Sequence, residues 1–167
     1  MSRIKDYQII TELMLKYSYN PRTGWFTSVV TTRSRAGTQR PNGYRLINIL
    51  GTPRYEHRLA WAYMTGSFPE EGQHIDHIDQ DKSNNQWANL RLATQQQNMW
   101  NTRKHLDSKS PYKGVTRING AKARPWKAQI YDNGKQVCLG HFASPEEAQS
   151  AYNVAAVAMR GEYACLA

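Results

Sequence analysis

Residues 73–98 read QHIDHIDQDKSNNQWANLRLATQQQN. They belong to an acidic segment, residues 68–101, that holds five acidic and two basic side chains. The flanking segments are basic: residues 1–67 carry a net charge of +7, and residues 102–167 carry +5. Basic surfaces can hold the phosphates of a polyanion, and a small acidic centre can hold a metal ion that assists phosphate chemistry. The same pattern is also consistent with a basic protein that has one solvated acidic loop.

Length and composition limit the class of protein. A chain of 167 residues allows one ordinary domain, or two or three small modules in series. Its 22 Lys and Arg against 13 Asp and Glu give a net charge of +9, as expected of a polyanion binder. No apolar run approaches the ~20 residues of a membrane span, and the N-terminus lacks the apolar segment of a secretory signal. Cys138 and Cys165 form no C-x-x-C pair, which excludes a cysteine zinc finger and predicts a soluble protein of a reducing compartment.

Before the acidic segment, hydrophobic periodicity and turn residues predict a series of short elements. In chain order these are a helix over residues 4–17, a turn feeding a strand over 19–27, a basic loop or mobile arm over 31–43, a hairpin over 44–55 and a helix over 57–65. Gly66 is expected to end that helix. The N-terminal part should therefore be a small α/β segment.

After the acidic segment, residues 102–111 read as a linker, and the pattern then changes to strands. The expected strands, joined by turns that contain Gly and Asn, are Lys113–Asn119, Trp126–Asp132 and Gln136–Phe142. A helix follows, with Ser144 as its N-cap, Pro145 at the first helical position and Gly161 at its end. One face of this helix carries small apolar residues, so we expect it to pack closely on a three-stranded antiparallel sheet.

Four separated elements in residues 76–98 form the pattern D-H-I-D…N-N…A-N-L-R…Q-N. This pattern resembles the HNH endonuclease family, in the form common in phage and intron-encoded homing nucleases. The resemblance covers residues 7–101, because Tyr19–Thr27, Gly43–Arg45 and His57–Trp61 are similar to the segments that precede the core in phage proteins. It implies a metal-dependent DNA endonuclease whose core is two strands and a helix.

The resemblance also implies roles for individual residues. His77 would be the general base, and Asp76 and Asn98 would hold a divalent metal ion. Asn89 would tie down the loop between the two strands through its amide, and Leu90–Ala93 would form the second strand. Many relatives have His at the position of Asn98, and the departure favours an oxygen-bound metal, Mg²⁺ or Mn²⁺, over a zinc site.

The chemistry of phosphodiester hydrolysis explains why these residue types occur together. The reaction needs an in-line water, a base for its proton, and positive charge on the phosphate and the departing oxygen. A neutral imidazole, with an ordinary pKa near ~6.5, can accept that proton at physiological pH. A carboxylate and an amide oxygen suit a hard cation. Because neighbours on a regular strand face opposite ways, Asp76 and His77 can serve one phosphate only if the strand ends or twists there.

Other interpretations of these residues are local. His74, His77 and Asp79 could form a structural metal site, or His77 could be a turn residue satisfied by hydrogen bonds. Turn formation is the expected role of four residues that stabilise tight loops: Asp79, Asp81, Asn84 and Asn85. His57, on a predicted helix with apolar neighbours, is expected to be packed or to face a phosphate rather than to be catalytic.

Residues 110–167 carry a second set of motifs. In order these are Tyr112–Val115, Trp126–Ile130, Leu139–Phe142, Glu146–Ala148 and Arg160–Glu162. They resemble the plant APETALA-two (ethylene-response-factor) DNA-binding domain, which lays a three-stranded sheet in the major groove. Cys138 stands where a tryptophan is usual, so the base preference of the plant domain is not carried over.

This second resemblance implies that strand side chains contact DNA. Those expected to face DNA are Arg117, Arg124, Lys127, Gln129 and Tyr131, with Lys113 and Gln136 on phosphates. An arginine can pair bidentately with guanine, and a glutamine with adenine. The simpler alternative is that Trp126, Ile130 and Phe142 form a core and the basic residues only a solvated face. Additional grip on the DNA backbone is expected from the N-terminal arginines Arg33, Arg35, Arg40 and Arg45.

Together these features predict an α+β protein in four parts. They are the basic N-terminal α/β segment of the nuclease module (1–67), the ββα-metal core (68–101), a linker (102–111) and the three-stranded DNA-binding domain (112–167). The predicted function is a phage homing-type HNH endonuclease that acts on double-stranded DNA, most simply by nicking. It would work as a monomer or weak dimer in the cytoplasm, that of the host if phage-encoded. The alternative is a sequence-specific DNA-binding regulator that no longer cleaves.

Overall fold

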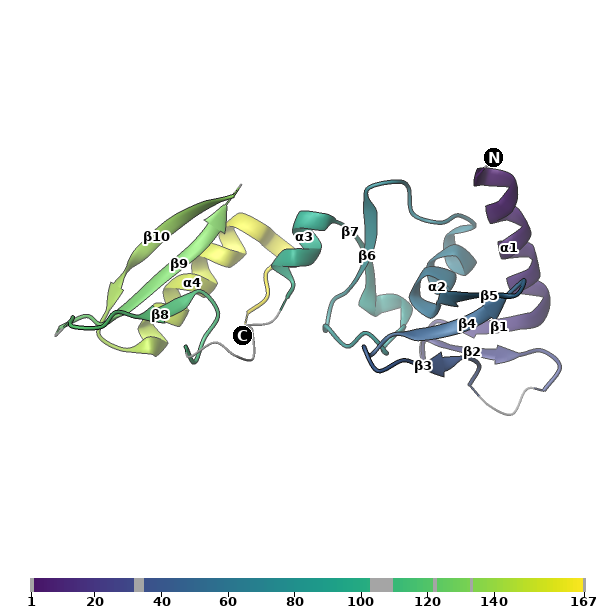
Figure 1. Ribbon diagram of the computed structural model, residues 1–167, viewed down its shortest axis with the longest axis horizontal. Helices are drawn as coiled ribbons and strands as arrows, with labels where there is room; N and C mark the ends of the chain where they lie inside the picture. The colour runs from purple at the N-terminus through teal and green to yellow at the C-terminus, as the bar shows by residue number, and fades with distance from the viewer. Residues whose placement is uncertain (1, 32–34, 103–109, 122, 133, 167) are drawn as a thin grey trace. The chain divides into compact units, whose positions relative to one another are not determined.

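The computed structural model describes residues 2–31, 35–102, 110–121, 123–132 and 134–166. By its internal contacts the chain divides into two compact units, residues 1–96 and 97–167, each of which is described by itself (Figure 1). Both units contain helices and small antiparallel sheets, so the predicted mixed α/β class is confirmed. Within the described ranges, no helix is long and apolar enough to cross a membrane.

The first unit begins with a helix, a hairpin and a small sheet. Helix α1 (Ser2–Lys16) leads into the antiparallel strands β1 (Tyr17–Asn20) and β2 (Trp25–Ser28). Strands β3 (Thr38–Gln39), β4 (Arg45–Ile49) and β5 (Thr52–Tyr55) form a second antiparallel sheet in that order. Helix α2 (Glu56–Thr65) follows β5 directly and ends at Gly66, as the sequence predicts.

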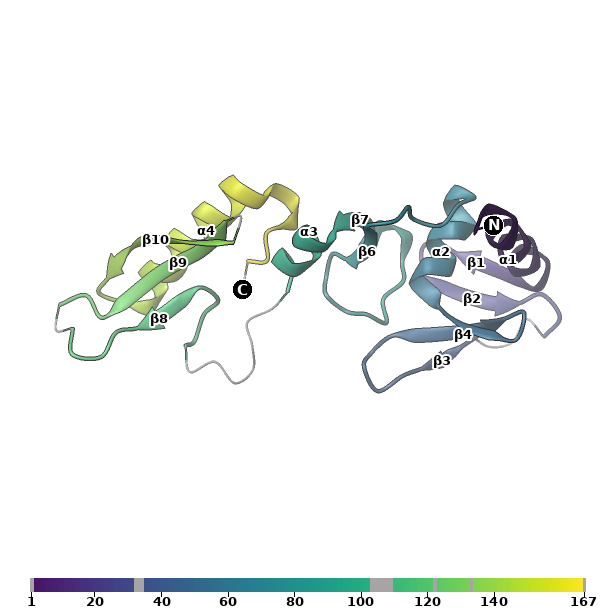
Figure 2. The same cartoon turned by 45° about the horizontal axis from the view of Figure 1, so that its top comes forward.

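One apolar core joins these elements. Leu13 of α1, Phe26 of β2, Ile47 of β4 and Leu59 of α2 are all buried in it. Helices α1 and α2 contact each other and both contact β4 (Figure 2). Full burial of one side chain of this size stabilises a fold by roughly 1.5–3 kcal/mol. These four side chains together therefore hold the helices and strands of the first unit in place.

Residues 31–43 are not the simple loop or mobile arm that their polar composition predicts. Thr38–Gln39 pair with β4 as strand β3, and Arg35 forms an isolated bridge with Thr27. The turn that follows β3 is closed by two backbone hydrogen bonds, from Arg40 N to Tyr44 O and from Gly43 N to Arg40 O. The turn-forming residues therefore reverse the chain into a hairpin instead of leaving it unpaired. Arg33 lies outside the described residues.

The acidic segment supplies the last two strands of the first unit. Strand β6 (Gln73–His77) pairs antiparallel with β7 (Leu90–Thr94), and a 3₁₀ turn, η1 (Trp87–Asn89), precedes β7. The loop between them contacts the β1–β2 turn at Gly24. This glycine has φ of +71°, and a Cβ there would lie 2.3 Å from the backbone of Asn85 and Gln86, so only glycine permits the approach.

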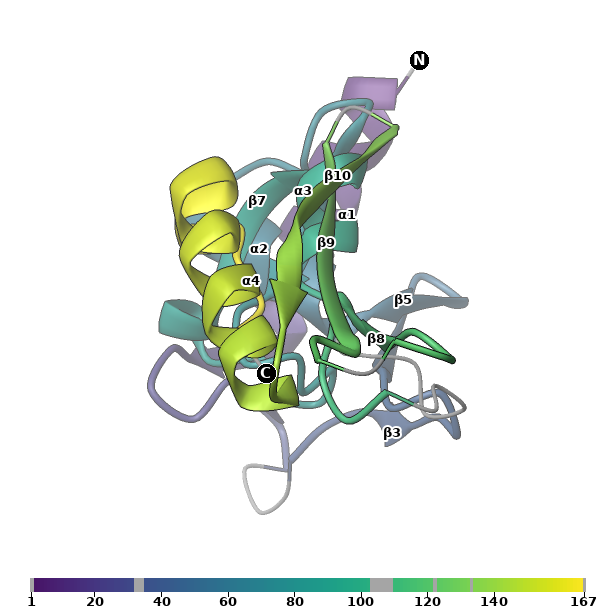
Figure 3. The ribbon, with the colours of Figure 1, turned by 90° about the vertical axis from the view of Figure 1, so that its left-hand side faces the viewer.

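Helix α3 (Gln95–Trp100) starts directly after β7, and the boundary between the two units falls inside it. The predicted linker, 102–111, lies mostly outside the described residues. The second unit then forms a sheet with strand order β10-β9-β8, from β8 (Val115–Arg117), β9 (Trp126–Asp132) and β10 (Lys135–Phe142). Helix α4 (Pro145–Arg160) lies along one face of this sheet (Figure 3) and is followed by a 3₁₀ turn, η2 (Gly161–Tyr163).

Small residues set the distance between α4 and its sheet. Ala148 and Ala156 of α4 are buried against Val115, Ala128 and Ile130 of the strands. The helix starts as its sequence predicts, since the Ser144 hydroxyl accepts a hydrogen bond from Glu147 N at 3.2 Å. The predicted packing of a small apolar helix face on a sheet is therefore what the second unit has.

Candidate active site

Asp76 and His77 lie at the end of β6, where the strand stops. Both side chains are buried, with 5% of each residue exposed. Across the β6–β7 pair, Asp76 is in register with Arg91, whose Nε and Nη2 lie 2.9 and 2.8 Å from Asp76 Oδ2. Two guanidinium N–H groups that donate to one carboxylate fix its direction. Arg91 is a site residue that sequence reasoning missed, although it stands in the A-N-L-R element.

The ring of His77 is oriented by Asn85. His77 Nε2 donates to Asn85 Oδ1 at 3.0 Å, in a contact that is buried on both sides. Because an amide oxygen only accepts hydrogen bonds, Nε2 carries the proton and Nδ1 is the proton-accepting nitrogen of the neutral ring. Burial lowers the pKa of His77, and this outweighs the raising effects of the Asn85 hydrogen bond and of nearby Asp79 and Asp76. The ring is therefore neutral at physiological pH, the state a general base needs.

Asn85 is itself fixed by the N-terminal hairpin. Its backbone oxygen accepts a hydrogen bond from the Tyr19 hydroxyl at 2.7 Å, and its backbone packs against Gly24. The residue is 1% exposed, so the structure replaces the turn-forming role expected for it with a buried positioning role. Nothing in the local sequence indicates this, because Tyr19 and Asn85 are 66 positions apart.

Asn89 ties down the β6–β7 loop through its side-chain amide. Its Nδ2 donates to Asp79 Oδ1 at 2.9 Å and to Asn84 O at 2.8 Å, while its Oδ1 accepts from Asp79 N at 3.0 Å. Asp81 adds an Asx turn by accepting from Ser83 N. These contacts are what the family resemblance implies for Asn89, and they make Asp79, Asp81 and Asn84 turn formers.

The alternative of a structural metal site gains no support. His74 is exposed and Asp79 is engaged within the loop. Among the residues that the structure describes, no group of three or more His, Cys, Asp and Glu side chains could hold a metal ion. The predicted pair of Asp76 and Asn98 differs from such a group, because it consists of one carboxylate and one amide. Asn98 lies on α3 in the second unit, and its role as a metal ligand stays a prediction.

Two aromatic rings, Tyr44 and His57, contact His77, and a third, Tyr55, contacts both of them; we call these three residues the ring cluster. The His57 ring is 5.2 Å from that of His77 in an edge contact, Tyr55 stacks on His57 at 5.4 Å, and Tyr44 lies 6.2 Å from His77. Burial, followed by the charges of His77 and Arg58, lowers the pKa of His57 to about 3. His57 is thus a packed neutral histidine, as its apolar neighbours suggest. The two tyrosines were missed, although the G-Y-R segment that contains Tyr44 belongs to the resemblance.

Two of the arginines expected to grip DNA have internal partners instead. Arg45 Nε lies 2.8 Å and Arg35 Nη2 3.3 Å from Oε2 of Glu56, which is fully buried at the start of α2. Arg35 Nη2 also donates to Ser83 O in the β6–β7 loop at 3.1 Å. A buried carboxylate attracts these guanidinium groups inward, which gives both arginines a structural role, and their expected grip on DNA stays a prediction. Arg40 remains exposed.

In the second unit, strand register decides which of the expected DNA-facing side chains share a face. Lys127, Gln129 and Tyr131 alternate with the buried Ala128 and Ile130 of β9, so they lie on the face away from α4. Gln136 and Cys138 are opposite Tyr131 and Gln129, and Thr116 and His141 are opposite Lys127, on that same outer face. Thr116 and His141 were not singled out from the sequence. Arg124 is exposed just before β9.

Two side chains expected to contact DNA from this sheet have partners within the second unit. Arg117 is opposite Trp126, and its guanidinium lies 5.9 Å from that ring, on the face of the buried Val115 rather than of Lys127. Lys113 Nζ donates to the backbone oxygens of Trp100, at 2.8 Å, and of Thr102. It is therefore held within the unit, and its expected phosphate contact stays a prediction.

Residues 54–100 match the family model described as HNH endonuclease. This segment of the chain therefore resembles HNH endonucleases. Over 123 residues it is 32% identical to an uncharacterized HNH endonuclease of Acanthamoeba polyphaga mimivirus, covering 74% of this chain and 62% of that protein. Over 81 residues it is 35% identical to Protein 3.8 of Escherichia phage T7, covering 48% of this chain and 64% of that protein. The chain thus spans less than two thirds of the length of either relative.

A solved structure is also similar to this chain. That structure concerns DNA binding and cleavage by the HNH homing endonuclease I-HmuI. The two chains are 30% identical with a TM-score of 0.41, and the match covers 50% of this chain and 49% of the other. The HNH family match contains Asp76, His77, Asn89 and Asn98. The likeness of residues 110–167 to the APETALA-two domain stays a prediction.

Proposed function

We propose that this chain is a metal-dependent endonuclease that hydrolyses phosphodiester bonds of double-stranded DNA, with His77 as the general base. The observation that carries the proposal is the buried, neutral His77, whose Nε2 is occupied by Asn85 while Asp76 stands next to it at the end of β6. A ring held in one tautomer can accept the proton of an attacking water through its other nitrogen. Neutrality and orientation are the two properties that the reaction demands of a base.

We assign metal binding to Asp76 and Asn98. A carboxylate oxygen and an amide oxygen are hard ligands that suit Mg²⁺ or Mn²⁺, so the donor types fit the ion. When bound, such an ion polarises the phosphate and stabilises negative charge on the departing 3′ oxygen. Arg91 fixes the direction of the Asp76 carboxylate through two contacts to one oxygen, Oδ2. Within this scheme Asn89 keeps the loop closed and Asn85 keeps the base oriented.

The products of this reaction would be 5′-phosphate and 3′-hydroxyl ends, and a nick is the simplest outcome because each chain has one such centre. The test is the conversion of supercoiled plasmid to open circles, with phage, host and unrelated DNA as substrates. We expect conversion with Mg²⁺ or Mn²⁺ and none with EDTA. If no DNA is cut under any of these conditions while tight, salt-sensitive binding is present, the chain is the non-cleaving regulator instead.

We further propose that the outer face of the second unit's sheet targets the nuclease to DNA. Lys127, Gln129 and Tyr131 form a row on β9 that mixes charge, amide and aromatic groups, the types that contact phosphates and base edges. Arg124 is exposed and precedes the start of β9 by two positions. A tethered reader raises the effective concentration of the HNH domain at its site without new contacts at the active centre.

Removal of charge from the two faces of this sheet tests the assignment. Lys127→Ala should weaken duplex binding by about three- to tenfold, a typical loss for one charged DNA contact. Arg117→Ala removes the same charge from the other face and should change binding by less than about twofold. Fluorescence anisotropy with a labelled duplex measures both. Equal losses in the two variants would refute the outer face as the reader.

A further inference from the structure

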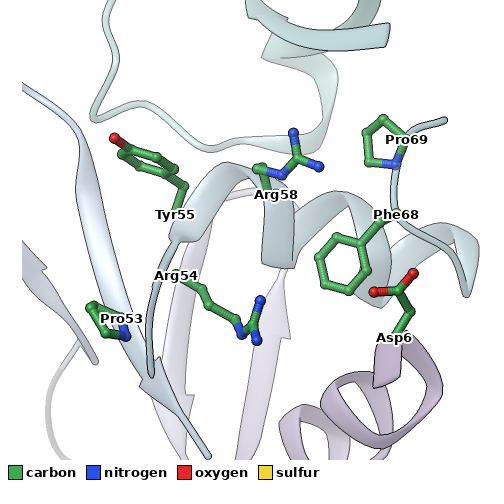
Figure 4. A pocket seen from close by; sticks show the side chains of 7 residues that line it. All are labelled: Asp6, Pro53, Arg54, Tyr55, Arg58, Phe68 and Pro69. Carbon is green, nitrogen blue, oxygen red and sulfur yellow. The ribbon is translucent and has the colours of Figure 1, made fainter. Parts of the chain in front are cut away.

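A cavity of about 380 Å³ in the first unit is lined by Tyr55, one residue of the ring cluster (Figure 4). Arg54 of β5 and Arg58 of α2 both line it, together with Tyr55 and Phe68. The two guanidinium groups therefore come from consecutive elements and border one space. Neither arginine was among the residues expected from the sequence to contact DNA.

Arg54 and Arg58 differ from the other half-buried arginines of this unit in having no internal partner. Arg35 and Arg45 are paired with Glu56, and Arg91 is paired with Asp76. For the side chains of Arg54 and Arg58, the described residues supply neither a hydrogen bond nor an ion pair, and Arg54 Nε is a buried donor without an acceptor. Buried donors are normally satisfied, so an acceptor from outside the chain would be favoured here.

The charged side chains that line the cavity favour the binding of an anion. Asp6 is the carboxylate that lines it, against two guanidinium groups, so the lining is net positive. An adjoining cavity of about 460 Å³ is lined by Asp6, Glu70 and Glu71. Like charges repel, so the acidic lining of the adjoining cavity disfavours an anionic ligand, whereas the guanidinium groups of Arg54 and Arg58 favour one.

The position of the cavity connects it to the base. Tyr55 lines the cavity and also stacks on His57 at 5.4 Å, and His57 contacts the ring of His77 at 5.2 Å. Two ring contacts thus separate the cavity wall from the proposed catalytic histidine. Along one DNA strand, successive phosphates are about 3.4 Å apart along the helix axis. A phosphate close to the one that reacts at His77 can therefore reach a cavity that is two ring contacts away.

We propose that Arg54 and Arg58 bind a backbone phosphate of the DNA substrate, close to the phosphate that is cut. The proposal rests on the DNA endonuclease function proposed above and adds a binding site to it. A phosphate has the acceptor oxygens that both guanidinium groups lack, and Arg binds phosphate in a planar, bidentate geometry. Such a contact positions the strand without reading its sequence.

The test is the salt dependence of binding to a random-sequence fluorescent duplex in EDTA. Arg54→Gln with Arg58→Gln should weaken binding by about five- to tenfold and reduce the slope of log affinity against log salt by about one, the value for one lost phosphate contact. Arg54→Lys with Arg58→Lys keeps both charges and should keep the slope. Thermal unfolding of each variant shows that it folds.

Lys5→Gln with Lys16→Gln is the matched control, because it removes two positive charges from α1 in the same unit, outside the cavity. If this control lowers affinity and slope as much as the double arginine variant, the cavity is not a phosphate site. If the arginine variant alone changes the slope, the site is established. Plasmid cleavage by the wild-type chain is measured separately, so a failure of the nuclease proposal does not obscure the binding result.

Discussion

Replacement of His77 by alanine should reduce plasmid nicking by about 10²- to 10⁴-fold, the usual contribution of a general base. The ring is neutral, held in one tautomer by Asn85, and placed next to Asp76, so its removal deletes proton transfer and little else. Since only 5% of the residue is exposed, its contribution to the DNA-contacting surface is small. Binding of a duplex should therefore stay within about a few-fold of wild type. Single-turnover nicking and anisotropy measure the two quantities.

His74→Ala is the control for this result, because it removes an exposed imidazole from the same strand and should leave nicking unchanged. A collapse of DNA binding in His77→Ala would instead show that the histidine has a structural role. The pH dependence gives an independent check. Burial lowers the pKa of His77, so the ring stays deprotonated below its ordinary range, and the acid limb of the rate profile should have its midpoint below pH ~6.5.

The sequence of residues 73–98 predicts most of the site because its signals are local. The hydrogen bonds of Asn89, Asp79 and Asp81 all close within a loop of a dozen residues, where Asx turns and a reciprocal amide are readable from spacing. The end of β6 at His77 also meets the condition that adjacency of Asp76 and His77 imposes. Local chemistry of this kind does not depend on how the remaining chain folds.

The groups that orient the site could not be predicted, since they come from distant parts of the chain. Asn85 is fixed by Tyr19 and Gly24 of the first hairpin, and the ring cluster packs Tyr44 and His57 against His77. Contacts across such separations depend on tertiary packing, which composition and periodicity do not encode. Residues that precede the HNH match thus hold Asn85 in place and pack against His77.

The roles of the basic residues were the hardest to predict, because each depends on where one side chain points or on the pairing register of one strand. Lys127 and Arg117 both read as strand residues, yet pairing places them on opposite faces of one sheet. In the same way, Arg45 reads as a surface residue until buried Glu56 is found beside it. Net charge predicts that a polyanion is bound, whereas the partners of each arginine decide which ones can do so.

Glu56→Gln should cost the first unit about 3–5 kcal/mol of unfolding free energy, the range for breaking a buried ion pair by removing one partner. Glu56 is fully buried, and Arg35 and Arg45, with side chains 21% and 12% exposed, both contact its Oε2. Burial raises the pKa of Glu56 against the lowering effect of the two arginines, which means that they offset the desolvation of the carboxylate only in part. Chemical denaturation followed by circular dichroism measures the loss.

Glu12→Gln is the matched control for Glu56→Gln, because Glu12 pairs with Lys16 at 2.6 Å on the exposed side of α1. A surface pair of this kind contributes about 0–1 kcal/mol, so the same chemical change should have little effect there. If Glu56→Gln unfolds like wild type, the cluster is not a structural anchor, and Arg35 and Arg45 return as candidates for DNA contact. If it is destabilised as expected, the link from Glu56 through Arg35 to Ser83 O connects the start of α2 to the loop that carries Asn85. The ion cluster then helps to hold in place the loop whose Asn85 orients His77.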